Sequence, residues 1–148
     1  MRLMSVQEKN KELVRRQFEQ LNAGDSHSAA ALWAPESWNH GRKVDRAALE
    51  RVYQSLSSLH ETHTLHEMIA EGEWVAVRTT CTGIHSGEPE IPVNGGIFQG
   101  LEPTGRTYTN QHLHFFRVID GQLTEHWANR DDLGVARQLG LELRSSKD

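Results

Sequence analysis

The sequence predicts an α+β domain in which a curved antiparallel or mixed sheet wraps around N-terminal helices. Apolar residues recur at helical spacing between Val6 and Leu56, and with a period of two from Thr62 onward. A short helical pattern follows the last strand. Helices laid on one curved sheet leave an open cone, whose interior is a natural cavity for a small molecule. The length of 148 residues indicates one domain, 1–148, with an ordered core of about residues 5–141.

Three helices are predicted ahead of the strands, each opened by a residue whose side-chain oxygen can accept an early backbone N–H. The caps and helices are Ser5 for 6–23, Asp25 or Ser26 for a short helix that passes Trp33 and ends at Pro35, and Asp45 for 45–56. Glu8 completes a capping box with Ser5. The first helix carries apolar residues on one side only, so that side is expected to be buried.

The stretch between the second and third helices has two interpretations. It holds Trp33 and the run Trp38, Asn39 and His40. These residues could supply an aromatic wall and polar groups at the mouth of a pocket. Alternatively, the tryptophans close the end of the core and Asn39 makes a turn.

The segment from Thr62 to Thr82 predicts a β-hairpin with a turn at Glu71-Gly72. We expect the histidines in and near it, His63, His66 and His85, to lie on the surface or at strand ends. The following stretch, 86–106, holds three prolines and five glycines. It is either the lid or mouth of a site or a meandering edge connection.

A second hairpin, 107–129, is the best candidate for a pocket wall. His112, His114 and Phe116 alternate along its first strand, and a buried imidazole requires a hydrogen-bond partner. A two-residue Asp-Gly turn would place Ile119 opposite Gln122 and His114 opposite Trp127. We favour a three-residue turn with a bulge at Gly121, which pairs Val118 with Gln122, His114 with His126 and His112 with Ala128. That register gathers the three histidines on one face and sends Trp127 to the other with Leu113 and Phe115.

Composition narrows the class of partner. The net charge is −4 with acids and bases interspersed, so nucleic acid is not an expected partner. No apolar run approaches the ~20 residues of a membrane span, and the N-terminus shows no signal-peptide core. The single cysteine, Cys81, alternates with apolar neighbours and is predicted to be a buried packing residue. We therefore expect a soluble cytoplasmic protein.

Several motifs, taken in order along almost the whole chain, resemble the SnoaL-like polyketide cyclase (ester cyclase) family. They lie at 10–16, 22–25, 38–40, 69–78, 103–106, 116–123, 125–127 and 137–140. The resemblance implies the nuclear-transport-factor-2-like cone, a homodimer packed through the outer sheet face, and cofactor-free aldol cyclisation of a polyketide. It assigns His114 and its neighbour His112 to the histidine region of the family site and Asn39 to a polar residue at the mouth. The family's acid/base aspartate position corresponds to Ala128, which carries no titratable group.

Two functions are therefore expected from the sequence. One is a cyclase or isomerase acting on a carbonyl substrate, with His114 or His126 as the base and Asn39 and His112 holding the enolate oxygen. Trp38, His40, Phe116 and Ala128 would line its ligand site. The other is a cone that binds a small hydrophobic ligand without breaking bonds, as the alanine at position 128 suggests. Proton exchange on a carbonyl compound would distinguish the two.

Two further interpretations concern the histidines themselves. His112, His114 and His126 would make a three-imidazole face suited to zinc. They could equally be inert lining whose hydrogen bonds are satisfied. The family resemblance favours a site without metal or other cofactor.

Overall fold

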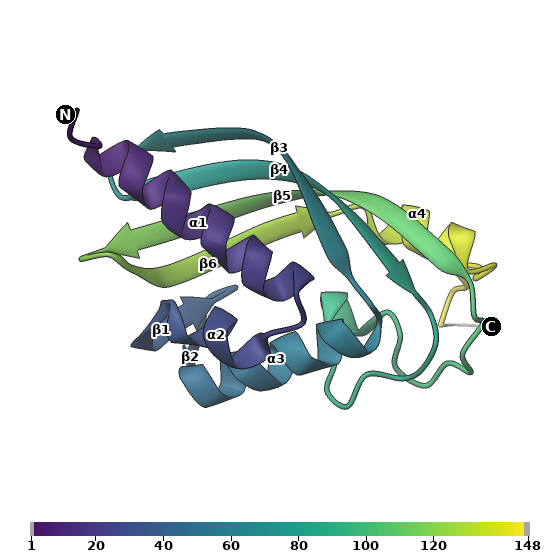
Figure 1. The fold of residues 1–148 in the computed structure, drawn as a ribbon. Helices are drawn as coiled ribbons and strands as arrows, with labels where there is room; N and C mark the ends of the chain where they lie inside the picture. Colours follow the sequence, from purple (N-terminus) through teal and green to yellow (C-terminus); the bar gives the residue numbers. More distant parts are fainter. Residues whose placement is uncertain (1, 147–148) are drawn as a thin grey trace.

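The computed structural model describes residues 2–146, and its six strands form one mixed sheet that curves around three helices (Figure 1). The elements are α1 Val6–Asn22, α2 Ser26–Ala31, β1 Trp33–Asn39, β2 Arg42–Asp45, α3 Arg46–Ser58, β3 Thr62–Glu71, β4 Trp74–Ile84, the 3-10 turn η1 Asn94–Gly96, β5 Thr107–Ile119, β6 Gln122–Arg130 and α4 Asp132–Gln138. The strand order is β2-β1-β6-β5-β4-β3. Only β1 and β6 pair in parallel. The predicted α+β class is confirmed.

The predicted helix starts are confirmed, because each cap makes its expected bond. The amide of Glu8 donates to Ser5 Oγ over 3.1 Å, and the amide of Ser5 donates to Glu8 Oε2 over 2.8 Å. Asp25 and Asp45 cap α2 and α3 in the same way. These contacts satisfy N–H groups that a helix leaves without internal partners.

The prediction that the second helix reaches Pro35 is wrong. The helix α2 ends at Ala31, and Trp33 begins strand β1. The amide of Leu123 donates to the carbonyl of Leu32 over 3.0 Å, and Trp33 lies opposite Leu123 in the parallel ladder. A strand 90 residues further along the chain therefore decides the conformation here, which local helical spacing cannot reveal.

The predicted register of the 107–129 hairpin is also wrong. Ile119 pairs with Gln122 across a two-residue turn in which Asp120 and Gly121 have φ of 49° and 73°. That geometry is a type I′ turn, whose twist matches the flanking strands. The ladder then slips by one residue between Arg117 and Val118, so His126 faces Phe116.

The consequence predicted for the two faces is nevertheless confirmed. The one-residue slip exchanges the two faces of β6, as the expected bulge would also have done. His112, His114 and His126 therefore project to the inner side of the sheet. Trp127 lies opposite Phe115 on the outer side, where both are 43% exposed. A bulge anywhere between the turn and His126 has this effect, because each inserted residue exchanges the faces beyond it.

Two apolar clusters fill the concave side of the sheet. The larger cluster joins α1, through Val14 and Phe18, to the inner face of the central strands. The smaller one lies under the 86–106 segment and includes Phe98 and Tyr108. Cys81 is fully buried, as predicted. Among the described residues, no helix is long and apolar enough to span a bilayer.

Candidate functional site

A cavity of about 600 Å³ lies between the inner face of the sheet, the helices and the 86–106 segment. Its lining comes from α1, α3, all strands except β4, and the turn around η1. The residues from Pro92 to Gly96 form part of the wall. The 86–106 segment therefore borders the cavity, as the mouth interpretation of the sequence requires.

Most of the residues predicted for the site line this cavity. They are Asn39, His40, His112, His114, Phe116, His126 and Ala128. Trp38 does not, because it alternates with Asn39 along β1 and projects to the outer side of the sheet, where it is 48% exposed. Trp33 is the tryptophan that reaches the cavity, and it is 1% exposed.

A chain of hydrogen bonds fixes the protonation of two histidines. Nδ1 of His126 lies 3.0 Å from Oδ1 of Asn39, an oxygen that can only accept, so His126 carries its proton on Nδ1. Its Nε2 is then an acceptor, and it lies 2.9 Å from Nδ1 of His114. His114 must donate from Nδ1, which leaves the lone pair of its Nε2 bare. That nitrogen is buried and has no hydrogen-bond partner within residues 2–146.

His112 is held in the complementary manner. Its Nε2 lies 3.2 Å from Oδ1 of Asn110, whose amide nitrogen donates to the carbonyl of Asp131 over 3.4 Å. His112 therefore donates from Nε2 and keeps a bare lone pair on Nδ1, which has no partner in the described chain. A nitrogen in this state can accept a proton or hydrogen bond but cannot donate one.

The structure adds His63, which the sequence analysis expected on the surface or at a strand end and which is the second residue of β3. His63 is 9% exposed, lines the cavity and has Nδ1 3.0 Å from Oγ1 of Thr79. His85 is also buried, so of the three histidines expected at the surface or at strand ends, His66 is the exposed one. The alternation of His63 with Leu65, both on the inner side of β3, is the signal that could have placed His63 inside.

Burial keeps these imidazoles neutral. Loss of solvation lowers the pKa of His63 to about 4 and those of His112 and His126 to about 3, and it also places the pKa of His114 well below its usual value. The neighbouring histidines and the Arg130 guanidinium lower the last three further. At neutral pH the cavity therefore presents uncharged nitrogen acceptors.

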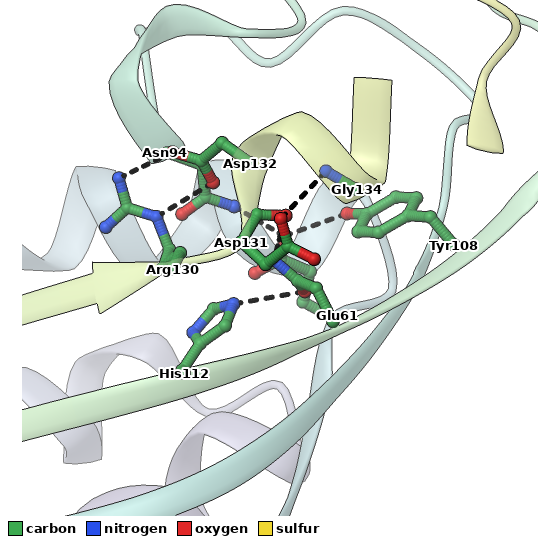
Figure 2. Close-up of polar contacts among 9 residues, drawn as sticks. Glu61, Asn94, Tyr108, His112, Arg130, Asp131, Asp132 and Gly134 are labelled. Atoms are coloured by element: carbon green, nitrogen blue, oxygen red, sulfur yellow. Dashed lines mark hydrogen bonds and ion pairs between the residues drawn. The ribbon is translucent and has the colours of Figure 1, made fainter. Parts of the chain in front are cut away.

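A buried carboxyl supports the end of the cavity near α4 (Figure 2). Oε1 of Glu61 accepts from Tyr108 Oη over 2.8 Å and from Asn94 Nδ2 over 2.7 Å. Burial raises the pKa of Glu61. Because Asn94 lines the cavity with a φ of 50°, this contact holds the wall in a conformation that few residues adopt.

The carboxylates that follow Ala128 serve other purposes. Asp131 accepts from the amide of Gly134 at the start of α4, and Asp132 bonds to Arg130 (Figure 2). The side chains lining the cavity include Arg42 and Arg130 but no aspartate or glutamate within the described chain. Besides the two arginines, the titratable side chains on the described wall are imidazoles and the phenol of Tyr53, whose pKa is raised by burial.

Comparisons with known proteins agree on one family. The protein-family model described as SnoaL-like polyketide cyclase matches residues 12–139 of this chain. Aklanonic acid methyl ester cyclase from Streptomyces sp. strain C5 is 29% identical over 139 residues, covering 87% of this chain and 80% of that protein. Nogalonic acid methyl ester cyclase from Streptomyces nogalater is 30% identical over 109 residues, covering 72% of this chain and 75% of that protein.

Solved structures show the same architecture. TsrD from Streptomyces laurentii superposes with a TM-score of 0.76 at 22% identity, over 95% of this chain and 100% of that chain. IdmH from Streptomyces antibioticus gives a TM-score of 0.72 at 28% identity, over 89% and 99% of the two chains. The nuclear-transport-factor-2-like cone implied by the sequence resemblance is confirmed.

Proposed function

Because the chain belongs to the SnoaL-like polyketide cyclase family, we propose that it catalyses a cofactor-free, aldol-type cyclisation of a polyketide-like carbonyl compound. The observation that carries the proposal is the bare Nε2 of His114, a residue of the cavity wall. Its tautomer is set by the hydrogen bond from its Nδ1 to His126. A base whose tautomer is already set for accepting a proton is what such a reaction requires.

In the proposed reaction, Nε2 of His114 removes a proton from a carbon beside a carbonyl group. The resulting enolate carbon attacks a second carbonyl carbon of the same molecule, forming the ring bond. The proton then moves from His114 to the new alkoxide, so the product has the mass of the substrate. His126 stabilises the imidazolium, because its Nε2 accepts from Nδ1 of His114 while Asn39 orients its other nitrogen.

The weak basicity of a buried imidazole restricts the substrate. A poorly basic nitrogen removes a proton efficiently only from an acidic carbon, such as a methylene between two carbonyl groups. The amide nitrogen of Asn39 is available for the enolate oxygen, because only Oδ1 bonds to His126. His112 does not suit the enolate role expected from the sequence, because its cavity nitrogen carries no proton in the tautomer set by Asn110.

Ala128 favours a second candidate, a cone that binds a small apolar ligand without reaction. The residue lies opposite His114 in the β5–β6 ladder, at the position that the family resemblance assigns to the acid/base aspartate. With alanine there, no carboxylate supports His114. The bare nitrogens of His112 and His114 would then act as fixed hydrogen-bond acceptors for hydroxyl groups of the ligand.

Aklanonic acid methyl ester and nogalonic acid methyl ester, the compounds in the names of the related cyclases, are suitable probes. We expect the protein to convert one of them to a product of equal mass by liquid chromatography and mass spectrometry, and to catalyse deuterium exchange at its acidic carbon. His114→Gln should lower both rates by about 10²–10⁴-fold. His66→Gln is the matched control, because His66 is exposed and bonds to Thr80 outside the cavity.

The outcomes separate the two candidates. Exchange that His114→Gln abolishes and His66→Gln preserves supports the cyclase. Saturable binding of the probes without exchange supports the ligand-binding cone and overturns the reaction. Exchange that is unchanged in His114→Gln refutes the role of His114.

A homodimer is part of the same proposal. Large apolar side chains are exposed on the outer face of the sheet, and they are Ile69, Leu113, Phe115 and Trp127 at 70%, 59%, 43% and 43% exposure. Burying such a face against a second copy would remove a contiguous apolar surface from water. A reducing cytoplasmic setting fits the one free, buried cysteine.

A further inference from the structure

Three histidines from two strands converge on one side of the cavity. A ring nitrogen of His63, one of His112 and one of His114 all lie within 4.8 Å of one another. The ring centroids form a nearly equilateral triangle, with sides of 5.2, 5.3 and 5.5 Å. All three side chains are at least nine-tenths buried, at 9%, 2% and 8% exposure.

Each imidazole has one nitrogen bonded to an outer partner. His63 is bonded through Nδ1 to Thr79, His112 through Nε2 to Asn110, and His114 through Nδ1 to His126. The opposite nitrogens of His112 and His114 are buried with no partner among residues 2–146. Metal-binding histidines show this division, in which one nitrogen bonds an outer partner and the other binds the ion.

We propose that His63, His112 and His114 form a binding site for a divalent transition-metal ion, with Zn²⁺ the ion that fits best. Imidazole nitrogen is a preferred zinc ligand, and a set of three protein ligands leaves a fourth position open for water or substrate. The proposed site faces the cavity, so a carbonyl oxygen of a ligand could occupy the fourth position.

The ring geometry is close to what zinc requires. With Zn–N distances of about 2.0–2.1 Å, tetrahedral ligation places imidazole centroids about 5.2 Å apart, if each nitrogen points at the ion. The observed sides of 5.2–5.5 Å therefore need ring rotation rather than strand movement. Rotation about side-chain torsions would bring the nitrogens to the ~3.3 Å separation of a tetrahedral site.

Nearby charge is compatible with a cation. A carboxylate oxygen of Glu61 lies within 4.8 Å of a ring nitrogen of His63, so an ionised Glu61 would offset part of the charge. The Arg130 guanidinium, which opposes a cation, is itself paired with Asp132 at 3.3 Å. Glu61, His63 and Cys81 form a second donor set, but Oε1 of Glu61 already accepts two hydrogen bonds and burial raises the pKa of the Cys81 thiol.

This site goes beyond the proposed cyclisation, which uses no metal. The two uses of Nε2 of His114 exclude one another, because a nitrogen that binds an ion cannot accept a proton. A metal would therefore compete with the base role of His114. The binding site is inferred from the side-chain arrangement and does not depend on the reaction.

The test is titration of chelator-treated full-length protein with Co²⁺ and with Zn²⁺. We expect one ion per chain by calorimetry, and a Co²⁺ absorption spectrum of tetrahedral type. Replacing a ligand, as in His63→Gln or His112→Gln, should weaken binding by more than the ~10–100-fold cost of losing an outer partner. Asn110→Ala removes such a partner and should itself cost about 10–100-fold.

His66→Gln is the matched control and should bind like the wild type. Circular dichroism establishes that each variant is folded, and anomalous diffraction from zinc-soaked wild-type crystals locates the ion even if the variants fail to fold. Absence of binding at 100-fold molar excess, or an ion located away from the three histidines, overturns the proposal. Deuterium exchange is assayed on the metal-free protein, because a bound ion would block Nε2 of His114. Metal binding by a protein that shows no exchange in the metal-free state would refute only the cyclase, and exchange without metal binding would refute only the metal site.

Discussion

Gly83 is predicted to be a position where one methyl group disrupts the support of the cavity. It lies opposite Tyr108 in the β4–β5 ladder, and the tyrosine ring covers it. A Cβ added at Gly83 would lie 3.0 Å from Cε1 of Tyr108 and closer still to Cζ and Oη. Tyr108 is 1% exposed, so its ring has little free space into which it can move.

The cost of Gly83→Ala can be estimated from these contacts. Overpacking a filled site costs about 1–3 kcal/mol. A displaced Tyr108 would also lose its bond to Glu61, which leaves a buried carboxyl short of a donor at about 1–3 kcal/mol. We expect Gly83→Ala to lower the free energy of unfolding by about 2–4 kcal/mol in total, because partial relaxation of the surrounding side chains makes the combined cost smaller than the sum of the two. That is a large part of the ~5–15 kcal/mol that typically stabilises a domain.

Urea unfolding followed by tryptophan fluorescence measures this change. Gly87→Ala is the matched control, since no atom lies within 4 Å of its added Cβ and its φ is not left-handed. The control should be unchanged or more stable by about 0.4–1 kcal/mol, because alanine restricts the unfolded chain. An unfolding midpoint for Gly83→Ala equal to that of the wild type would refute the packing argument.

Two further predictions concern the assembly and the pH dependence of stability. Sedimentation should give twice the 16.8 kDa chain mass for the wild type. Leu113→Glu should be a monomer, because it puts a charge on the exposed outer face of the sheet. A wild-type monomer at micromolar concentration would exclude the dimer. Burial lowers the pKa of His85 below its usual value of 6.5, so the unfolded chain binds more protons than the folded one between the two values, and stability falls as the pH drops below 6.5. The free energy of unfolding of His85→Gln should therefore depend less on pH between 7.5 and 5.5 than that of the wild type, and equal slopes would contradict this.

The shape of the cavity and the chemical groups on its wall are separate features of this fold. The cone and its histidine strand match the expectation from the sequence motifs, and the described lining carries histidines, Tyr53 and two arginines but no aspartate or glutamate. Function on such a scaffold follows from the side chains that project inward rather than from the fold. The bare nitrogens of His112 and His114 are therefore the features to test first.

Features that depend on near neighbours in the chain could be predicted from the amino-acid sequence. The capping residues Ser5, Asp25 and Asp45 each contact a backbone group three positions away, so their patterns were sufficient to predict the helix starts. Strand alternation likewise placed His112 and His114 on one face, because successive side chains point to opposite sides.

Contacts between residues of distant segments could not be predicted from local patterns, because strand pairing in the folded chain fixes them. The strand conformation of 33–39 depends on pairing with β6, and the ladder of β6 with β5 slips by one residue between Arg117 and Val118. His63 reaches the cavity because β3 pairs with β4 in a register that puts His63 opposite Cys81. Trp38 lies outside because Asn39, next to it, faces His126. Each outcome is fixed by hydrogen bonds between strands far apart in the chain, which local periodicity does not encode.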